Sequence, residues 1–83
     1  MQQSARTPKQ IGAVVRRSRR HAGLTQAALA EKIGVRQATI SRLEQGRDDL
    51  RLTTLLDVLA ALGLQIIIDE RGKTSLEDIE SLF

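Results

Sequence analysis

The chain has 83 residues, of which 41% are apolar and one is aromatic, which suits one small domain with an aliphatic core. It has no cysteine, and this excludes disulfide bonds, thiolate metal sites and cysteine nucleophiles. The net charge of +3 is divided unevenly, because residues 1–51 hold eleven Lys/Arg against four Asp/Glu whereas residues 52–83 hold two against six. A basic first part favours a polyanionic partner such as nucleic acid, although an ordinary solvated surface of mixed charge gives the same count.

The first predicted helix begins at Pro8 and ends before Gly23. Proline suits the first turn of a helix, Thr7 can cap that turn, and glycine fits the position just beyond the last turn. Residues 1–7 are polar, and we expect them to form a flexible N-terminus. The residues expected to face the core are Ile11, Val14, Val15 and Ser18, and those expected to point elsewhere are Arg16, Arg17 and Arg20.

Two shorter helices follow. Thr25 caps the second, which closes at Gly34, and the third runs from about Gln37 to Gln45. In this interpretation every glycine of the chain sits at a helix end. Two short helices joined by a tight glycine-containing turn, the second exposing polar and basic groups, are typical of a helix-turn-helix. The residues predicted to face inward here are Leu29, Ala30, Ile33, Val35, Ile40 and Leu43.

The outer face of the third helix carries the chemistry for reading base pairs. An α-helix fits the major groove, where Arg binds guanine through two hydrogen bonds, Gln binds adenine and a small apolar side chain contacts the thymine methyl group. An ordinary amphipathic helix with a solvated face is the alternative. The residues left on this outer face are Gln37, Ala38, Ser41 and Arg42.

A fourth helix is expected to be capped by Thr53 or Thr54 and to end at Gly63, with an apolar face formed by Leu52, Leu55, Leu56, Leu59 and Leu62. The consecutive β-branched residues that follow predict a strand, because such side chains suit a pleated surface. A lone strand leaves its backbone groups unpaired, so we expect it to pair with the same strand of a second copy in an antiparallel ribbon. The alternative is a fourth helix that continues through Ile68. The predicted strand residues are Gln65, Ile66, Ile67 and Ile68.

The last segment, residues 70–83, is acidic, and the chain is therefore divided into residues 1–7, a domain of residues 8–69 and this tail. Thr74 with Glu77, or Ser75 with Asp78, can form a capping box. Two interpretations stay open: a short helix that docks on its own dimer, or a segment that folds against a partner. Its apolar residues are Leu76, Ile79, Leu82 and Phe83.

Nothing in the sequence indicates an enzyme, a metal site or a cofactor. The single histidine, His21, lies near the end of the first helix without partners, and Asp48 and Asp49 are interpreted as a loop pair. The longest apolar run, from Leu55 to Leu64, is too short to span a membrane, and no charged-then-apolar leader opens the chain. We therefore expect a non-enzymatic, cytoplasmic protein without membrane contact.

The stretch "LTQAALAEKIGVRQATISRLEQG" resembles the helix-turn-helix core of the lambda-repressor-like (Xre) superfamily, and the resemblance covers about residues 10–63. Within it, "QATIS", the Leu/Thr start of the fourth helix and "LGLQIIID" are similar to HipB antitoxins. The resemblance implies a mainly helical bundle of four to five helices plus one C-terminal strand paired across a homodimer. It also implies a repressor of its own operon that binds a palindromic operator in double-stranded DNA and neutralises a HipA-like Ser/Thr kinase toxin.

The resemblance also implies roles for particular residues. Base edges are expected to be contacted by Arg36, Gln37, Ala38, Ser41 and Arg42. Phosphates are expected to be contacted by Gln26, Thr39, Gln45 and Arg47, which would fix register without reading sequence. Arg19 and Glu44 match a structural ion pair. The tail residues are a candidate toxin-binding segment that the resemblance does not assign. The rival interpretations are a stand-alone regulator of the phage-repressor or restriction-controller kind and an interaction module without DNA binding.

Overall fold

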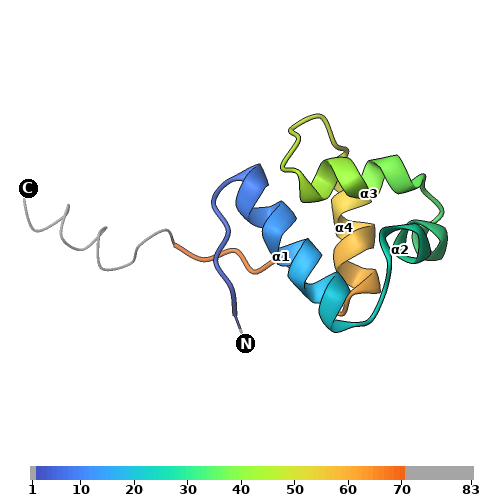
Figure 1. Ribbon diagram of the computed structural model, residues 1–83. Coiled ribbons are helices and arrows are strands. Elements are labelled where there is room, and N and C mark those ends of the chain that lie inside the picture. The colour runs from blue at the N-terminus through green and yellow to red at the C-terminus, as the bar shows by residue number, and fades with distance from the viewer. Residues whose placement is uncertain (1, 71–83) are drawn as a thin grey trace, which may run out of the picture.

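The computed structural model describes residues 2–70, and four helices lie within that range. They are α1 (Pro8–His21), α2 (Gln26–Ile33), α3 (Gln37–Glu44) and α4 (Leu52–Ala61) (Figure 1). The prediction of a mainly helical chain with these four helices is confirmed. Across residues 2–70, no helix combines the length and the apolar character needed to cross a membrane.

Local sequence signals account for the start of α1 and for both ends of α2. The Thr7 hydroxyl accepts a hydrogen bond from the Gln10 backbone N–H at 3.1 Å, and the Thr25 hydroxyl accepts one from the Ala28 N–H at 3.0 Å. Gly34 ends α2 in the left-handed conformation with φ 75°, which glycine adopts without a steric penalty. Of these signals, Gly34 is the one that lies at the turn between α2 and α3.

The expected cap of α4 was wrong. This helix begins at Leu52, one residue before the first of the two candidate threonines, and its N-cap residue Arg51 makes no side-chain capping bond. The start of α4 is fixed by packing: Leu50 and Leu55, on either side of the cap, both contact the core.

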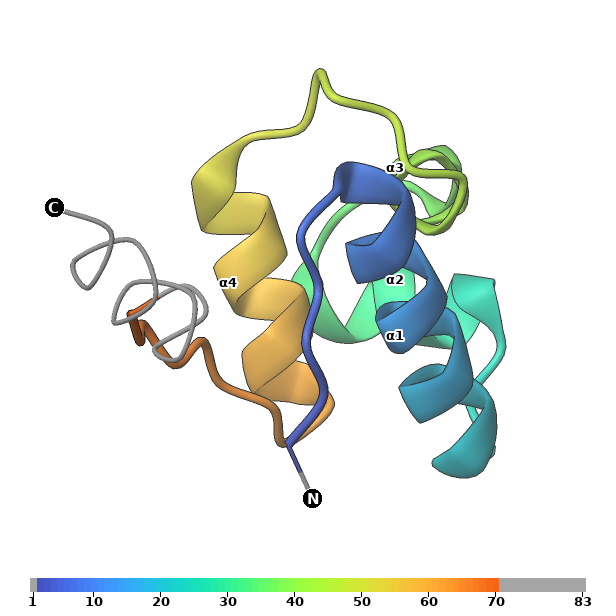
Figure 2. The ribbon, with the colours of Figure 1, turned by 90° about the vertical axis from the view of Figure 1, so that its left-hand side faces the viewer.

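All four helices contribute to one aliphatic core. Figure 2 shows α3 nearly end-on, with α1 and then α4 to its left in that view. The fully buried side chains Val15, Leu29, Ile40 and Val58 come from α1, α2, α3 and α4 respectively. The helix-turn-helix is thus held as a rigid unit, because α2 and α3 each place a fully buried residue in the same core.

The predicted apolar face of α4 was partly wrong. Leu59 is buried and Leu55 and Leu62 pack against the core, but Leu52 is 65% exposed and Leu56 is 45% exposed. Val58, outside the predicted face, is fully buried instead. A helix with leucines on several sides fits more than one apolar face, so periodicity alone did not select the side that faces α2.

The predicted strand is not confirmed, because residues 64–70 form no strand in this single copy. The alternative of a continuous helix is wrong: α4 ends at Ala61, and Gly63 follows with φ 70°. The isoleucines after this turn lie at the surface, with Ile68 95% exposed. The tail residues Leu76, Ile79, Leu82 and Phe83 lie outside the described part of the chain.

Gly12 corrects the expectation that every glycine sits at a helix end, since it is a buried residue in the interior of α1. A Cβ atom at this position would lie 2.5 Å from the Leu43 carbonyl oxygen and 2.7 Å from that of Glu44. The missing side chain therefore lets α1 cross directly over the last turn of α3. Only glycine fits this crossing without moving one of the two helices.

Candidate nucleic-acid interface

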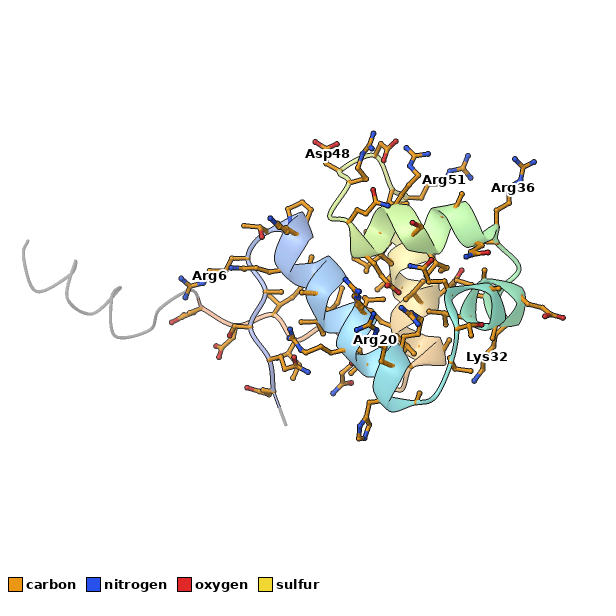
Figure 3. The ribbon with its side chains drawn as sticks, in the orientation of Figure 1. Arg6, Arg20, Lys32, Arg36, Asp48 and Arg51 are labelled. Atoms are coloured by element: carbon orange, nitrogen blue, oxygen red, sulfur yellow. The ribbon has the colours of Figure 1, made fainter. Side chains whose placement is uncertain are left out.

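The outward side of α3 carries exposed polar and small side chains over a buried anchor. Ile40 is fully buried and Leu43 is 4% exposed, so the inner side of α3 is fixed to the core. Ser41 and Thr39 are half-buried. The remaining predicted base-contacting residues, Arg36, Gln37, Ala38 and Arg42, are exposed. Figure 3 shows Arg36 extending into solvent at the end of α3 nearest α2.

Arg42 forms an ion pair with Asp49, in the loop between α3 and α4. Both side chains are about half exposed, so the pair is open to solvent and to a competing anion. Sequence reasoning placed Asp49 in a loop pair with Asp48 and missed this contact. Asp49 follows Arg42 by seven residues across the turn at Gly46, and no periodicity rule links those positions.

A second polar contact fixes the C-terminal half of the same face. The Gln45 side-chain amide donates a hydrogen bond to the Ser41 hydroxyl at 2.9 Å. Gln45 and Arg47 are both exposed at the end of α3 and in the loop that follows. The predicted phosphate contacts Gln45 and Arg47 therefore lie beside the predicted base contacts, at the α1 end of α3.

Under this face, a buried ion pair joins α1 to α3. Arg19 Nε donates to Glu44 Oε2 at 2.6 Å and Arg19 Nη2 donates to Glu44 Oε1 at 3.0 Å, which is a bidentate pair. Arg19 Nη1 also donates to the Leu24 carbonyl at 2.8 Å. The arginine thereby connects α1, the loop before α2 and the last turn of α3.

Gln26 extends this cluster into α2. Its side-chain amide donates to Glu44 Oε1 at 3.2 Å, so the residue predicted to contact phosphate is bound to the structural ion pair. Gln26 is only half-buried and occupies the first position of α2, where helix N-terminal amides favour an anion. A phosphate bound at this end of α2 would thus lie near Gln26, which is itself hydrogen-bonded to Glu44.

Hydrogen bonds stabilise the charged forms of Arg19 and Glu44. Burial by itself would raise the pKa of Glu44, but the hydrogen bonds from Arg19 and Gln26, together with the positive charges of Arg19 and Arg16, bring that pKa below its ordinary value. The hydrogen bond to Glu44 raises the pKa of Arg19. Glu44 is therefore ionised at neutral pH.

No group of three or more His, Cys, Asp or Glu residues that could hold a metal ion occurs between residues 2 and 70. The interface is instead dominated by guanidinium, amide and hydroxyl groups on one side of the helix-turn-helix. These are the donors and acceptors that proteins use on base edges and phosphates.

Comparison with known proteins agrees with this geometry. Residues 15–67 match the helix-turn-helix family model. The antitoxin HipB of Escherichia coli K12 is 36% identical over 74 residues, which cover 89% of this chain and 84% of that protein. A solved complex of a HipB variant with an O2 20mer superposes with a TM-score of 0.76 at 38% identity, covering 86% of this chain and all of that one. A HipA–HipB–O2–O3 complex gives a TM-score of 0.75 at 37% identity, covering 84% of this chain and all of the matched one.

Proposed function

Because the chain belongs to the helix-turn-helix family and is a HipB-like member of it, we propose that it is the antitoxin of a toxin–antitoxin pair. In this proposal it represses its own operon by binding a palindromic operator and neutralises a HipA-like Ser/Thr kinase toxin. The family match and the similarity to HipB over most of the chain support a DNA-binding HipB-like antitoxin.

The observation that carries the DNA-binding part is the outward face of α3. Its exposed Arg, Gln and Ala side chains stand on a helix whose other side is locked into the core through Ile40 and Leu43. We assign base contacts to Arg36, Gln37, Ala38, Ser41 and Arg42. We assign phosphate contacts to Gln26, Thr39, Gln45 and Arg47, with Arg19 and Glu44 positioning the helices. Repression then needs no catalysis, because the bound protein occupies the promoter.

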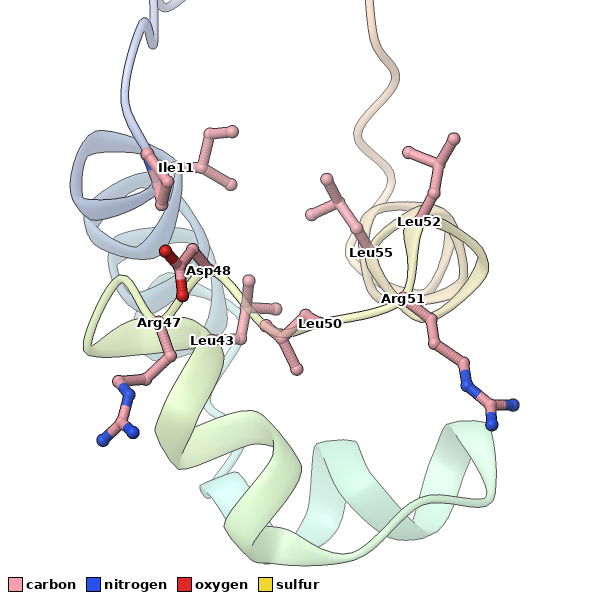
Figure 4. A pocket seen from close by; sticks show the side chains of 9 residues that line it. Ile11, Leu43, Arg47, Asp48, Leu50, Arg51, Leu52 and Leu55 are labelled. Atoms are coloured by element: carbon pink, nitrogen blue, oxygen red, sulfur yellow. The ribbon is translucent and has the colours of Figure 1, made fainter.

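Dimer formation is supported by apolar surface that one copy leaves uncovered. Leu52 and Leu56 lie one turn apart on α4 and are both exposed, and Ile66, Ile67 and Ile68 are exposed beyond its end. An apolar groove between α1 and the start of α4 adjoins this surface. Figure 4 shows Leu55 projecting from α4 toward Ile11, with Leu52 next to it on the same helix.

We therefore propose that a second copy covers Leu52 and Leu56 and that residues 65–68 of the two copies pair as an antiparallel ribbon. A twofold dimer would require an inverted-repeat operator, with half-sites one helical turn or a multiple of a turn apart. Association would remove exposed isoleucine and leucine side chains from water and satisfy the backbone groups of the paired segments.

The toxin-binding part rests on the similarity to HipB, which has been solved together with HipA. We propose that residues 70–83 of this chain contribute to that contact through Leu76, Ile79, Leu82 and Phe83. An acidic segment with apolar side chains at helical spacing suits a partner groove with a basic rim. The rival function is a stand-alone transcription regulator with no toxin partner.

Affinity purification from the natural host tests this part. The tagged full-length chain and a version without residues 70–83 would be recovered from lysate, and the co-purifying proteins identified by mass spectrometry. A stoichiometric kinase-like protein encoded beside this gene would support the antitoxin function, and its loss on truncation would assign the tail. Recovery of the homodimer alone, from cells that express the neighbouring gene, would leave the stand-alone regulator.

A further inference from the structure

We propose that Lys9, Arg16 and Arg20, on α1, form a second contact with the phosphate backbone of the DNA that α3 reads. These three residues are called the α1 basic stripe below. The inference rests on the proposed DNA binding and adds to it a surface outside the helix-turn-helix. It concerns affinity and orientation on the duplex, because phosphate contacts carry no sequence information.

The spacing of the three residues puts them on one side of α1. Arg16 follows Lys9 by seven residues and Arg20 follows Arg16 by four, which are steps that return to the same face of an α-helix. All three side chains are exposed. Together with Ala13, Arg17, Glu44 and Gln45 they line one open hollow between α1 and the end of α3. Figure 3 shows Arg20 on the front of α1, below α3 in that view.

The close crossing of the two helices sets the position of the stripe. Gly12 brings α1 against the carbonyl oxygens of Leu43 and Glu44, and Gly46 lies against the Lys9 backbone. The basic residues next to Gly12 on the helix surface are therefore held beside Gln45, itself a proposed phosphate contact. A backbone that passes the C-terminal end of α3 would meet the hollow without any movement of α1.

The positive charge of the stripe is not neutralised within the described residues. The ion pairs in residues 2–70 are Arg19–Glu44 and Arg42–Asp49, and neither includes a stripe residue. The one carboxylate that lines the hollow, Glu44, already accepts hydrogen bonds from Arg19 and Gln26. Arg16 lies near enough for its charge to lower the pKa of Glu44, yet it makes no ion pair with it.

Two kinds of partner would suit three cations in a hollow: a phosphate backbone and an acidic protein segment. The location favours DNA, because the hollow is continuous with Gln45 at the end of the proposed reading helix. A cation that replaces a condensed counterion on DNA contributes about −0.9 to the slope of log K against log salt. Removing two stripe cations should therefore flatten that slope by about 1.8.

The test compares two pairs of substitutions that remove the same charge. Arg16→Gln with Arg20→Gln empties the stripe of its arginines, whereas Arg6→Gln with Lys32→Gln removes two exposed cations that do not line the hollow. Each protein is titrated at several salt concentrations against a duplex of its own promoter and a scrambled duplex of equal length. The stripe pair should flatten the slope by about 1.8 on both duplexes, and the matched pair by far less. Arg16→Lys with Arg20→Lys should retain the wild-type slope.

Equal slopes for the stripe pair and the matched pair would overturn the inference. It would also fall if the stripe pair bound DNA normally but lost a co-purifying kinase-like partner, since the stripe would then serve a protein. A wild-type chain that binds both duplexes equally would count against sequence-specific repression instead, and the slopes on the scrambled duplex would still decide the role of the stripe. Thermal melts of all variants check that these exposed substitutions leave the fold intact.

Discussion

Arg19 and Glu44 join the first and third helices through a bidentate ion pair, with Nε–Oε2 and Nη2–Oε1 distances of 2.6 and 3.0 Å. The side chains are 9% and 4% exposed, so the pair is nearly removed from solvent. It lies directly under the face proposed to contact DNA. The contact therefore joins α1 to the last turn of α3 beside the crossing at Gly12.

Glu44→Gln should destabilise the protein at neutral pH by roughly 3 kcal/mol, because Arg19 would keep its charge in a buried site without a carboxylate. The pKa of Glu44 is lowered in the folded state, so folding releases protons from this group and its contribution is fully present above its ordinary pKa of 4.5. The contribution is lost as the pH falls through the lowered folded-state pKa. Urea unfolding of both proteins between pH 7 and pH 3 should show a difference that shrinks toward the acid end. A constant difference would mean that the ionised form of Glu44 is not what matters.

Gly12→Ala should lower the free energy of unfolding by more than about 1 kcal/mol, since the new methyl group would overlap the Leu43 and Glu44 carbonyls. The sign of the effect is informative. Replacing glycine by alanine inside an unobstructed helix stabilises it by up to about 1 kcal/mol. Thermal or urea unfolding decides between the two signs, and a more stable variant would show that α1 and α3 do not cross as closely as described.

Much of the fold could be predicted because its signals are local. Thr7 and Thr25 cap helices, Gly34 adopts a positive φ, and Ile40 and Leu43 recur at helical spacing; each feature can be read within a few residues. The crossing at Gly12 could not be predicted in this way, because the atoms that require glycine belong to another helix. Nor could the buried face of α4, whose leucines suit several orientations until α2 is in place.

The candidate interface also combines features that can be predicted from the local sequence with contacts that depend on the fold. The exposed side of α3 follows from its periodicity, so the outward positions of Gln37 and Arg42 were accessible from the sequence. The pairing of Arg42 with Asp49 depends on the path of the loop after Gly46, and the alignment of the α1 basic stripe with Gln45 depends on the helix crossing. Both features join segments that come together only in the folded chain.

Gln37→Ala should lose roughly 1–3 kcal/mol of binding free energy on the cognate operator and less on a scrambled duplex, because a base contact discriminates between sequences. Arg47→Ala is the control. It removes an exposed side chain from a proposed phosphate contact and should weaken both complexes by similar amounts. Titration by fluorescence anisotropy at fixed salt gives the affinities of the wild type and both variants for the two duplexes. If Gln37→Ala lost the same binding free energy on both duplexes, Gln37 would contact the phosphate backbone of the DNA and not a base.

Asp49→Asn should tighten DNA binding about threefold, because an exposed ion pair of this kind is worth up to about 1 kcal/mol and competes with DNA for Arg42. Asp48→Asn, at the neighbouring position, removes the same charge without touching the pair and should have a smaller effect. In an Arg42→Gln background the two aspartate substitutions should become equivalent. If Asp49→Asn instead weakened binding to the operator alone, Asp49 would be orienting Arg42 toward its base.

Replacing Leu52 and Leu56 together by Gln should raise the dissociation constant of the homodimer by more than tenfold and leave the monomer folded. The two leucines are 65% and 45% exposed in one copy, so they contribute little to its own core. Covering them in a dimer would be worth roughly 1 kcal/mol each, and the loss of both therefore corresponds to a factor of tens in affinity. The matched control replaces Thr53 and Asp57, the exposed residues one position further along α4, by Gln. Sedimentation over a range of concentrations should show the control as a dimer where the leucine variant is monomeric, whereas equal association of the two would place the interface elsewhere.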